Sequence, residues 1–363
     1  MTDAGMTDAQ IQLLGNILSV PATVGHERPL FGHLHDLLDG PDRVATQYQG
    51  LLAVRCGSGK GPVFAAHIDR HGLVCNAPGE YEYAAHALRY RDSNPASARA
   101  ESPELLERIC ERFLDQHVRA YNPWDGAQIA EGRITGSRLS QRLNTLVFTI
   151  DADAEIPVGA PLAYDTPMAL EADTVAGQID NALCVAMLAD LCLQGFDGIA
   201  LFSAEEEAGR SWRYLMDWML REERAGREHG PLYVIDTSPF ADRETQAEQQ
   251  IVLRQQDEHA RFDPMLTNHV MAVCDELALS HRFKDSFIQG LNEQAREKGE
   301  SEKRLGATEL GRLIVASDGA MTGTTLQIAT TGYHTAWETA LIEHIHPLNK
   351  LMRALCERPV PMG

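Results

Sequence analysis

Residues 180–207 read DNALCVAMLADLCLQGFDGIALFSAEEE, and this stretch carries the pattern that decides the fold. The run 182–193 is almost wholly apolar, which predicts a helix that is buried against a sheet. The run 199–204 that follows is short and mostly apolar, as in a strand buried on both faces. A buried helix followed by a buried strand is typical of an α/β domain.

Similar elements lie on both sides of this stretch. Apolar runs predict further strands at 51–56, 63–66, 232–235 and 326–330, and helices over 212–220, over 264–279 and from Pro347 onward. The glycine-rich segment 57–61 predicts a hairpin turn between the first two strands. Residues 284–306 are strongly charged and predict a solvated helix or loop.

The segment 73–165 differs in character from the rest of the chain. It mixes short β-like runs and turns with one helix over 102–118, for which Ser102 is the expected cap. We therefore predict two domains. Residues 1–72 and 166–363 form a mixed sheet flanked by helices, and residues 73–165 form a smaller, inserted, β-rich domain that serves assembly or substrate access.

Composition excludes several classes of protein. The 363 residues include 32 lysines and arginines against 52 aspartates and glutamates, a formal charge of −20, which argues against binding to nucleic acid. No run of about 18 apolar residues occurs, so we expect no membrane span. The seven cysteines are odd in number and show no C-x-x-C spacing, and the N-terminus lacks a signal-peptide pattern. These features predict reduced thiols and a cytoplasmic location.

Five metal-ligand residues stand at comparable places along the chain. Each follows a predicted strand or precedes a predicted helix: His67, Asp180, Glu207, Asp236 and His334. Because ligands of open α/β sheets bind beyond the carboxyl ends of the strands, these side chains should meet at one edge. Two histidines and three carboxylates suit a pair of divalent ions, with one carboxylate shared between them. The sequence therefore predicts metal-assisted hydrolysis.

Each of these residues also has an ordinary structural explanation. His67 could be structural or exposed, Asp180 could cap the following helix, and Asp236 could be a turn residue. His334 could be a loop histidine. In favour of a ligand role for His67, Asp69 lies two residues on and could fix the imidazole by a hydrogen bond. His71 is an alternative ligand nearby.

The acidic run 205–207 allows two interpretations. Charge runs usually form solvated faces. This run instead interrupts a buried strand–helix junction, where adjacent carboxylates repel one another unless a cation offsets them. A turn here would direct Glu207 towards a metal and leave Glu206 facing a substrate as a general base.

The order of these motifs resembles the M42 family of metallo-aminopeptidases, which includes the glutamyl and TET aminopeptidases. The stretches that carry the resemblance are His67-Ile68-Asp69, Asp180-Asn181, Glu206-Glu207-Ala208-Gly209, Val234-Ile235-Asp236 and Tyr333-His334-Thr335-Ala336-Trp337-Glu338. The sequence departs from the family pattern at Arg70-His71 and at Ala182. The resemblance implies a zinc-peptidase-like catalytic domain and assembly into homo-oligomers, from dimers up to dodecamers.

The sequence thus predicts an aminopeptidase that hydrolyses N-terminal residues from peptides with two divalent ions per subunit, Zn²⁺ first and Co²⁺ or Mn²⁺ as alternatives. In this hypothesis Asp180 is shared by both ions. His67 and Asp236 complete one site, and Glu207 and His334 complete the other. Glu206 transfers the proton and Asp69 orients His67. Two alternatives stay open: a deacylase acting on N-acyl amino acids, and a non-catalytic assembly or binding protein.

Overall fold

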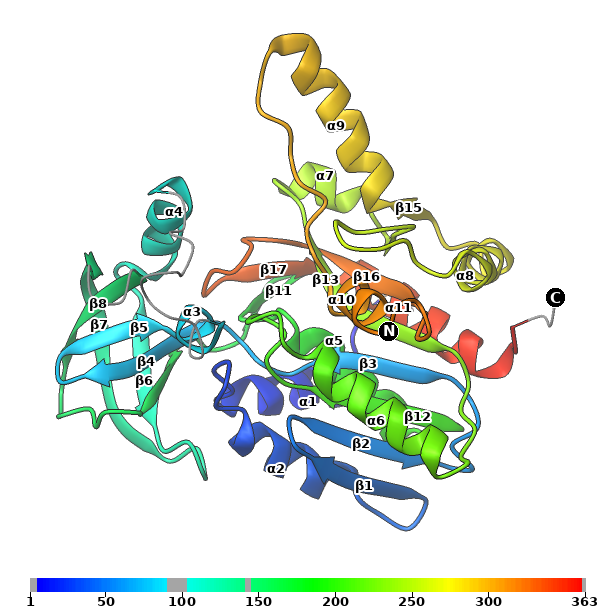
Figure 1. Ribbon diagram of the computed structural model, residues 1–363, viewed down its shortest axis with the longest axis horizontal. Coiled ribbons are helices and arrows are strands. Elements are labelled where there is room, and N and C mark those ends of the chain that lie inside the picture. The colour runs from blue at the N-terminus through cyan, green and yellow to red at the C-terminus, as the bar shows by residue number, and fades with distance from the viewer. Residues whose placement is uncertain (1–4, 90–102, 141–144, 361–363) are drawn as a thin grey trace.

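The chain forms a large mixed sheet covered by helices and a smaller closed barrel, as seen in the computed structural model, which describes residues 5–89, 103–140 and 145–360 (Figure 1). This architecture confirms the predicted fold class. The division into two domains at 73 and 165 stays a prediction.

Eleven strands within the described residues make up the sheet, in the order β1-β2-β12-β3-β13-β16-β17-β11-β10, with β14 joined to β16 and β15 to β14. Their bounds are β1 Arg43–Tyr48, β2 Leu51–Cys56, β3 Val63–His67, β10 Ala169–Leu170, β11 Thr174–Gly177, β12 Gly198–Ser203, β13 Leu232–Pro239, β14 Ile251–Leu253, β15 His281–Phe283, β16 Thr324–Thr331 and β17 Glu338–Leu341. The central strands β12, β3, β13 and β16 run parallel. Their carboxyl ends therefore meet at one edge of the sheet.

Helices cover both faces of the sheet. One face packs against α1 Asp8–Ser19, α2 Arg28–Leu38, α5 Ala182–Leu193, α8 Pro264–Glu276 and α11 Ile342–Glu357. The other face packs against α6 Trp212–Arg224 and α10 Glu309–Ala316. The helix α5 is buried along its whole apolar length except at its last residue, so it fills the space beneath β3 and β12 as the sequence predicts.

The barrel closes in the order β4-β5-β8-β7-β6-β9. Its strands are β4 Gly72–Ala77, β5 Glu80–Tyr83, β6 His117–Tyr121, β7 Gln128–Ser140, β8 Thr145–Ala152 and β9 Pro161–Tyr164, and α3 Ala84–Arg89 and α4 Pro103–Phe113 accompany them. Aromatic rings fill its interior, with Phe113 between Phe148 and Tyr164 at centroid distances of 5.1 Å to each. The chain enters through β4 and leaves through β9, and these two strands pair with each other.

Two local predictions differ from the structure, and a third lies on a residue that the structure does not describe. β2 and β3 do not form a hairpin, because the apolar strand β12 inserts between them and pairs with both. Pro347 does not start the last helix, since α11 begins at Ile342 and its buried face already includes Ile345. The expected cap Ser102 lies outside the described residues.

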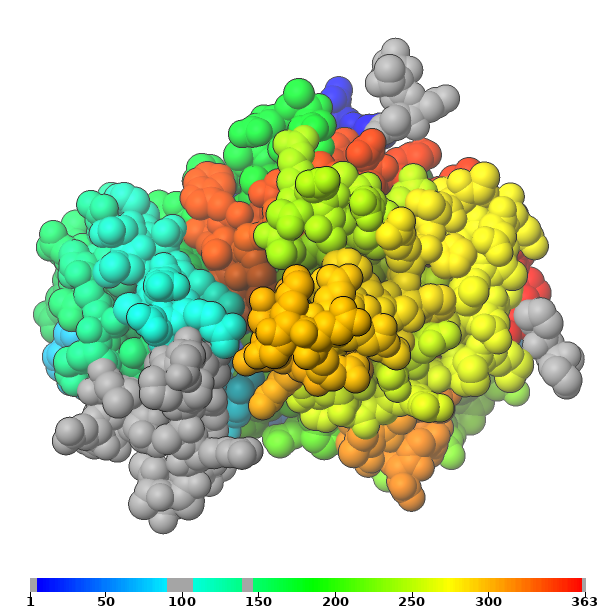
Figure 2. All heavy atoms as spheres, turned by 90° about the horizontal axis from the view of Figure 1, so that it is seen from above, coloured from blue at the N-terminus to red at the C-terminus, as the bar shows by residue number. Residues whose placement is uncertain are grey.

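The remaining helices α7 Arg243–Ala247 and α9 Lys284–Lys298 project from the edge at which the central strands end (Figure 1). Viewed from above, α9 lies between α4 of the barrel and α8 (Figure 2). The predicted solvated helix in this charged segment is confirmed over most of α9, whose buried residues are confined to Lys284, Asp285 and Ile288. None of the described helices is long and apolar enough to cross a bilayer.

Candidate active site

The five expected ligands converge on the carboxyl edge of the sheet. His67 is the last residue of β3, and Asp180 lies between β11 and α5. Glu207 lies in the turn after β12, and His334 follows β16. Asp236 does not end its strand as predicted, because β13 continues to Pro239 through pairing with β16. Its side chain nevertheless reaches the same edge.

His67 forms the first group with two carboxylates. Its Nε2 atom lies 3.4 Å from Oδ1 of Asp180 and 3.4 Å from Oδ1 of Asp236. Its Nδ1 atom lies 3.2 Å from the backbone oxygen of Asp69 and 3.6 Å from that residue's Oδ1 atom. Burial alone would lower the pKa of His67, but the surrounding carboxylates raise it well above its ordinary value. The cluster thus favours a positive charge at this position.

Glu207 is the centre of the second group. Its Oε2 atom lies 3.6 Å from Nε2 of His334, which in turn lies 3.9 Å from Oδ2 of Asp180. His71 joins this group, because its Nε2 atom lies 3.0 Å from the same oxygen of Glu207. The sequence identified His71 only as an alternative to His67, and the structure places it with the other ligands. The four-residue spacing from His67 was the available signal.

A buried aspartate shapes the acidic turn. The carboxylate of Asp69 accepts the backbone N–H groups of Glu206 at 3.0 Å and of Glu207 at 2.9 Å. The three glutamates then diverge. Glu207 faces the histidines, Glu206 meets Nη1 of Arg312 at 3.0 Å, and Glu205 pairs with Arg210 at 3.0 Å. The acidic run is therefore not a solvated face.

Glu338 holds the backbone of two candidate ligands in place. Its carboxylate accepts the backbone N–H groups of Asp180 and of His334, each at 2.8 Å. Glu338 is the last residue of the motif that begins at Tyr333, and the sequence alone does not indicate this role. Asp180 does not cap α5, because Asn181 occupies the cap position and donates its amide to the backbone oxygen of Ile235 at 2.9 Å. The peptide bond between Asp180 and Asn181 is cis.

The donor set fits divalent cations. Tetrahedral zinc with bonds of about 2.0–2.1 Å holds its ligand atoms about 3.3 Å apart, close to the 3.4 Å separations around His67. Oδ1 of Asp180 and Oε1 of Glu207 are buried and receive no hydrogen bond from any described residue. Buried acceptors without donors are costly unless a cation satisfies them. Imidazole and carboxylate together suit zinc, cobalt and manganese.

Burial is the largest influence on the pKa values of the carboxyl groups in the site. It raises the pKa of Glu207 well above its ordinary value, with Asp180 as the next contributor, and it raises the pKa of Asp236. Burial also raises the pKa of Glu206 to about 8, against the opposing charges of His67 and Arg312. A carboxyl group with this pKa can both take up and release a proton near neutral pH.

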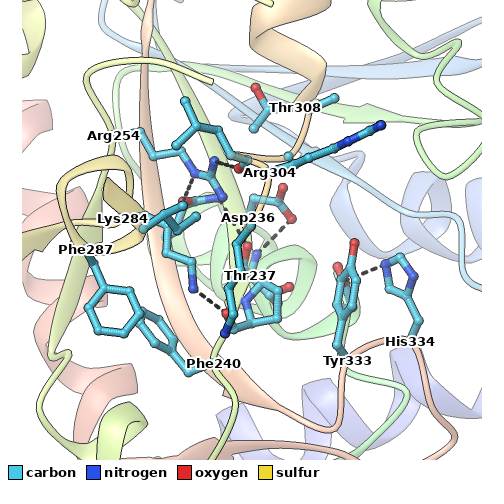
Figure 3. A pocket seen from close by; sticks show the side chains of 18 of the residues that line it. Asp236, Thr237, Phe240, Arg254, Lys284, Phe287, Arg304, Thr308, Tyr333 and His334 are labelled. Carbon is cyan, nitrogen blue, oxygen red and sulfur yellow. Dashed lines mark hydrogen bonds and ion pairs between the residues drawn. The ribbon is translucent and has the colours of Figure 1, made fainter. Parts of the chain in front are cut away.

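A cavity of about 420 Å³ extends from these groups towards α9. His67, Glu206 and His334 lie at one end, and Arg254 and Lys284 line the part beyond Asp236. In Figure 3, Arg254 and Lys284 lie on one side of Asp236, and His334 with Tyr333 lies on the other. The sequence does not identify Arg254 or Lys284 as site residues, because neither lies in a recognisable local pattern.

Arg254 and Lys284 are buried positive charges without a partner carboxylate. The arginine donates to Oε1 of Gln327 and to the backbone oxygen of Leu305, each at 2.8 Å. The lysine donates to the backbone oxygen of Pro239, and its Nζ atom lies 3.4 Å from the ring centre of Phe240. Neither forms an ion pair with a carboxylate of residues 5–89, 103–140 or 145–360. Burial and the nearby cations Arg254 and Lys303 lower the pKa of Lys284 to about 7.

No protein-family model and no curated protein sequence matches the chain. Its structure does resemble solved structures. The TET1 peptidase of Pyrococcus horikoshii is 16% identical with a TM-score of 0.64, over 96% of this chain and 99% of that one. Aminopeptidase APDkam598 from Desulfurococcus kamchatkensis is 14% identical with a TM-score of 0.68, over 96% and 95%. A TET aminopeptidase from a marine-sediment Thaumarchaeota archaeon is 13% identical with a TM-score of 0.69, over 97% and 96%. The chain therefore has the fold of the TET aminopeptidases over nearly its whole length, in agreement with the sequence motifs.

Proposed function

We propose that this chain is a dinuclear-metal-dependent aminopeptidase that removes acidic residues from the N-termini of peptides. One observation carries the proposal. Two ligand groups meet at Asp180 beside Glu206, at one end of a cavity that is also lined by the buried side chains of Arg254 and Lys284.

The ligand residues divide between two cations. His67, Asp180 and Asp236 would hold one, and Glu207, His334 and Asp180 would hold the other, with Zn²⁺, Co²⁺ or Mn²⁺ as the candidate metals. When bound, such ions supply Lewis acidity for the scissile carbonyl and lower the pKa of a water molecule. The unpartnered oxygens of Asp180 and Glu207 support this assignment.

Glu206 is the proposed proton carrier. Its carboxylate would accept a proton from the attacking water and pass it to the departing amine. Arg312 orients this carboxylate through the 3.0 Å contact, and Asp69 fixes the backbone of the turn through its two hydrogen bonds. Asp69 also contacts Nδ1 of His67, so it would orient a ligand and the base together.

The buried, positively charged side chains of Arg254 and Lys284 support a preference for substrates with an acidic N-terminal residue. A buried cation loses its hydration, and a carboxylate partner compensates this loss best. Because no described carboxylate plays this part for Arg254 or Lys284, the side chain of a substrate glutamate or aspartate would do so. The chain carries a net charge of −20, so an unbalanced positive pocket is opposite in sign to the rest of the molecule.

A panel of chromogenic aminoacyl substrates tests the proposal. Glutamyl and aspartyl derivatives should be hydrolysed faster than the neutral glutaminyl and leucyl derivatives. A chelator should abolish turnover, and Zn²⁺, Co²⁺ or Mn²⁺ should restore it. A second comparison uses Leu-Glu and Leu-Gln dipeptides, which places the acidic side chain after the scissile bond. A preference seen only in this comparison would mean that Arg254 and Lys284 contact the residue that follows the scissile bond. No hydrolysis of any free-amine substrate would overturn the proposal.

Two alternatives are distinguished by the same assay. A deacylase would hydrolyse N-acetyl derivatives and spare the free amines. A non-catalytic binding protein would hydrolyse neither and would stay folded without metal. The complete ligand set and the aligned proton carrier favour an enzyme.

Assembly and location complete the proposal. The TET1 peptidase of Pyrococcus horikoshii can assemble into a tetrahedron or a large octahedral shell. We extend homo-oligomer formation to this chain, and light scattering after size-exclusion chromatography would test it. A cytoplasmic location is supported by the seven cysteines, all of which have free thiols.

A further inference from the structure

His71 occupies the loop between β3 and β4, next to the second group of ligands. Its side chain is 5% exposed, and its Nε2 atom lies 3.0 Å from Oε2 of Glu207. Nε2 of His334 lies 3.6 Å from the same oxygen, and the two imidazole rings are 3.8 Å apart between centres. One ligand atom from each of these three residues falls within 4.8 Å of the others.

The contact between His71 and Glu207 is not a hydrogen bond. Nε2 of His71 is buried and has no hydrogen-bonding partner among the described residues, and Oε1 of Glu207 has none either. The separations of 3.0 Å and 3.6 Å lie on either side of the roughly 3.3 Å expected between neighbouring ligands of a tetrahedral ion. The three side chains therefore surround a common point rather than bond to one another.

The other nitrogen of His71 is held by the barrel. Nδ1 lies 2.6 Å from the hydroxyl of Tyr83 on β5. The ring of Tyr83 packs edge-on against Phe113 at a centroid distance of 5.4 Å, which fixes the hydroxyl in place. Because a hydroxyl can accept as well as donate, Nδ1 can carry the proton and leave the lone pair of Nε2 free. This arrangement is that of a metal-binding histidine with its supporting partner.

We propose that His71 is a protein ligand of the cation held by Glu207 and His334. This inference rests on the proposed dinuclear site and goes beyond it, because neither of the two ligand sets proposed above includes His71. The second position then has two imidazoles and the first has one, that of His67. Imidazole nitrogen favours zinc and cobalt over manganese, so the two positions differ in affinity and in metal preference.

Zinc binding by the full chain tests the inference without reference to turnover. Calorimetric titration of the metal-free protein should give two binding events for wild type. His71→Leu keeps an apolar side chain of similar size in a buried place and should weaken one event by at least about 100-fold while sparing the other. Tyr83→Phe removes only the support of Nδ1 and should weaken the same event by about 10-fold. Equal affinities in wild type and His71→Leu would overturn the inference.

A spectroscopic measurement on the wild-type protein tests the same inference without the use of a variant. X-ray absorption of the protein loaded with two zinc ions should show three imidazoles shared between them, and two imidazoles would overturn the inference even if His71→Leu failed to fold. The visible absorption spectrum of the cobalt-loaded protein should change on His71→Leu, because a coordinating nitrogen is removed. Two tight binding events without peptidase activity would overturn the proposed function and leave the ligand assignment intact. A wild-type protein that binds no zinc would overturn both.

Discussion

The Nη1 atom of Arg312 lies 3.0 Å from the Oε1 atom of Glu206. The arginine comes from α10 and the glutamate from the turn after β12, so two distant parts of the chain build this pair. A guanidinium at this distance stabilises the charged carboxylate and lowers its pKa, against a larger effect of burial that raises it. Arg312 thus moderates the basicity of the proposed proton carrier.

Arg312→Met should raise the pKa of Glu206. A base works in its deprotonated form, so the acidic limb of the pH profile of kcat/KM should move to higher pH. One pKa unit would lower kcat/KM about tenfold on that limb. Arg312→Lys, which keeps the charge, should show a smaller displacement. An acidic limb that stays in place in Arg312→Met would refute a role for the pair.

Glu206→Gln should lose most turnover while keeping its metals. The amide cannot accept the proton, and loss of a general base typically costs about 10²–10⁴ in rate. Metal content by mass spectrometry and thermal unfolding should match wild type. Glu205→Gln is the matched control, because its side chain pairs with Arg210 instead and its turnover should persist. Full activity in Glu206→Gln would remove this residue from the mechanism.

The preference for acidic substrates should weaken as pH rises through about 7. The Lys284 ammonium has a pKa of about 7, lowered by burial and by Arg254 and Lys303, so it is charged below this pH and neutral above it. The ratio of kcat/KM for glutamyl and glutaminyl substrates should therefore fall between about pH 6 and pH 8. The neighbouring Asp285 accepts the backbone N–H of Gln255 and provides no ion pair.

Lys284→Met should lower that ratio and remove most of its pH dependence. Lys350→Met on the surface of α11 serves as the control and should keep the wild-type ratio at every pH. Equal ratios in Lys284→Met and wild type would exclude the lysine from substrate recognition.

Asp69→Asn should weaken metal binding by about 10–100-fold, the usual effect of losing a partner that orients ligands. The amide group of asparagine would face one of the two backbone N–H groups that the carboxylate now accepts. Asp263→Asn is the matched control. Its carboxylate also accepts two backbone N–H groups, of Met265 and Leu266, at the start of α8. This variant should keep its zinc affinity and nearly all of its stability, as measured by calorimetry and denaturant unfolding, because asparagine caps a helix about as well as aspartate.

The sequence predicted those parts of the fold that depend on local pattern. The bounds of α5 are as predicted, since a run that is apolar except at Asp190 and continues from 182 to 193 is too long for a typical buried strand and indicates a buried helix. The sequence also predicts β2 and β3, but not that β12 lies between them. The insertion of β12 between β2 and β3 depends on contacts between segments that lie about 140 residues apart in the sequence. The glycine-rich turn gives no indication of these contacts.

The residues of the candidate site likewise fall into those that a local sequence pattern predicts and those that it does not. Residues at strand ends, such as His67, are recognisable because parallel strands bring their ends together. Lys284 was not recognisable, because it opens a charged helix whose remaining side chains are mostly solvated. Its inward position follows from packing against Phe240, which the sequence does not reveal. His71 was visible as a histidine, but its assignment to the second group depends on the position of Glu207.

The pairing of β4 with β9 means that the chain enters and leaves the barrel through two adjacent strands, where Gly72 faces Ala163. A short peptide could bridge these two residues, so the barrel could be exchanged for another module without breaking the sheet. Such an exchange would remove Tyr83 and leave Nδ1 of His71 without its partner. A chain that uses His71 as a ligand therefore needs a barrel that supplies a hydroxyl group at that place.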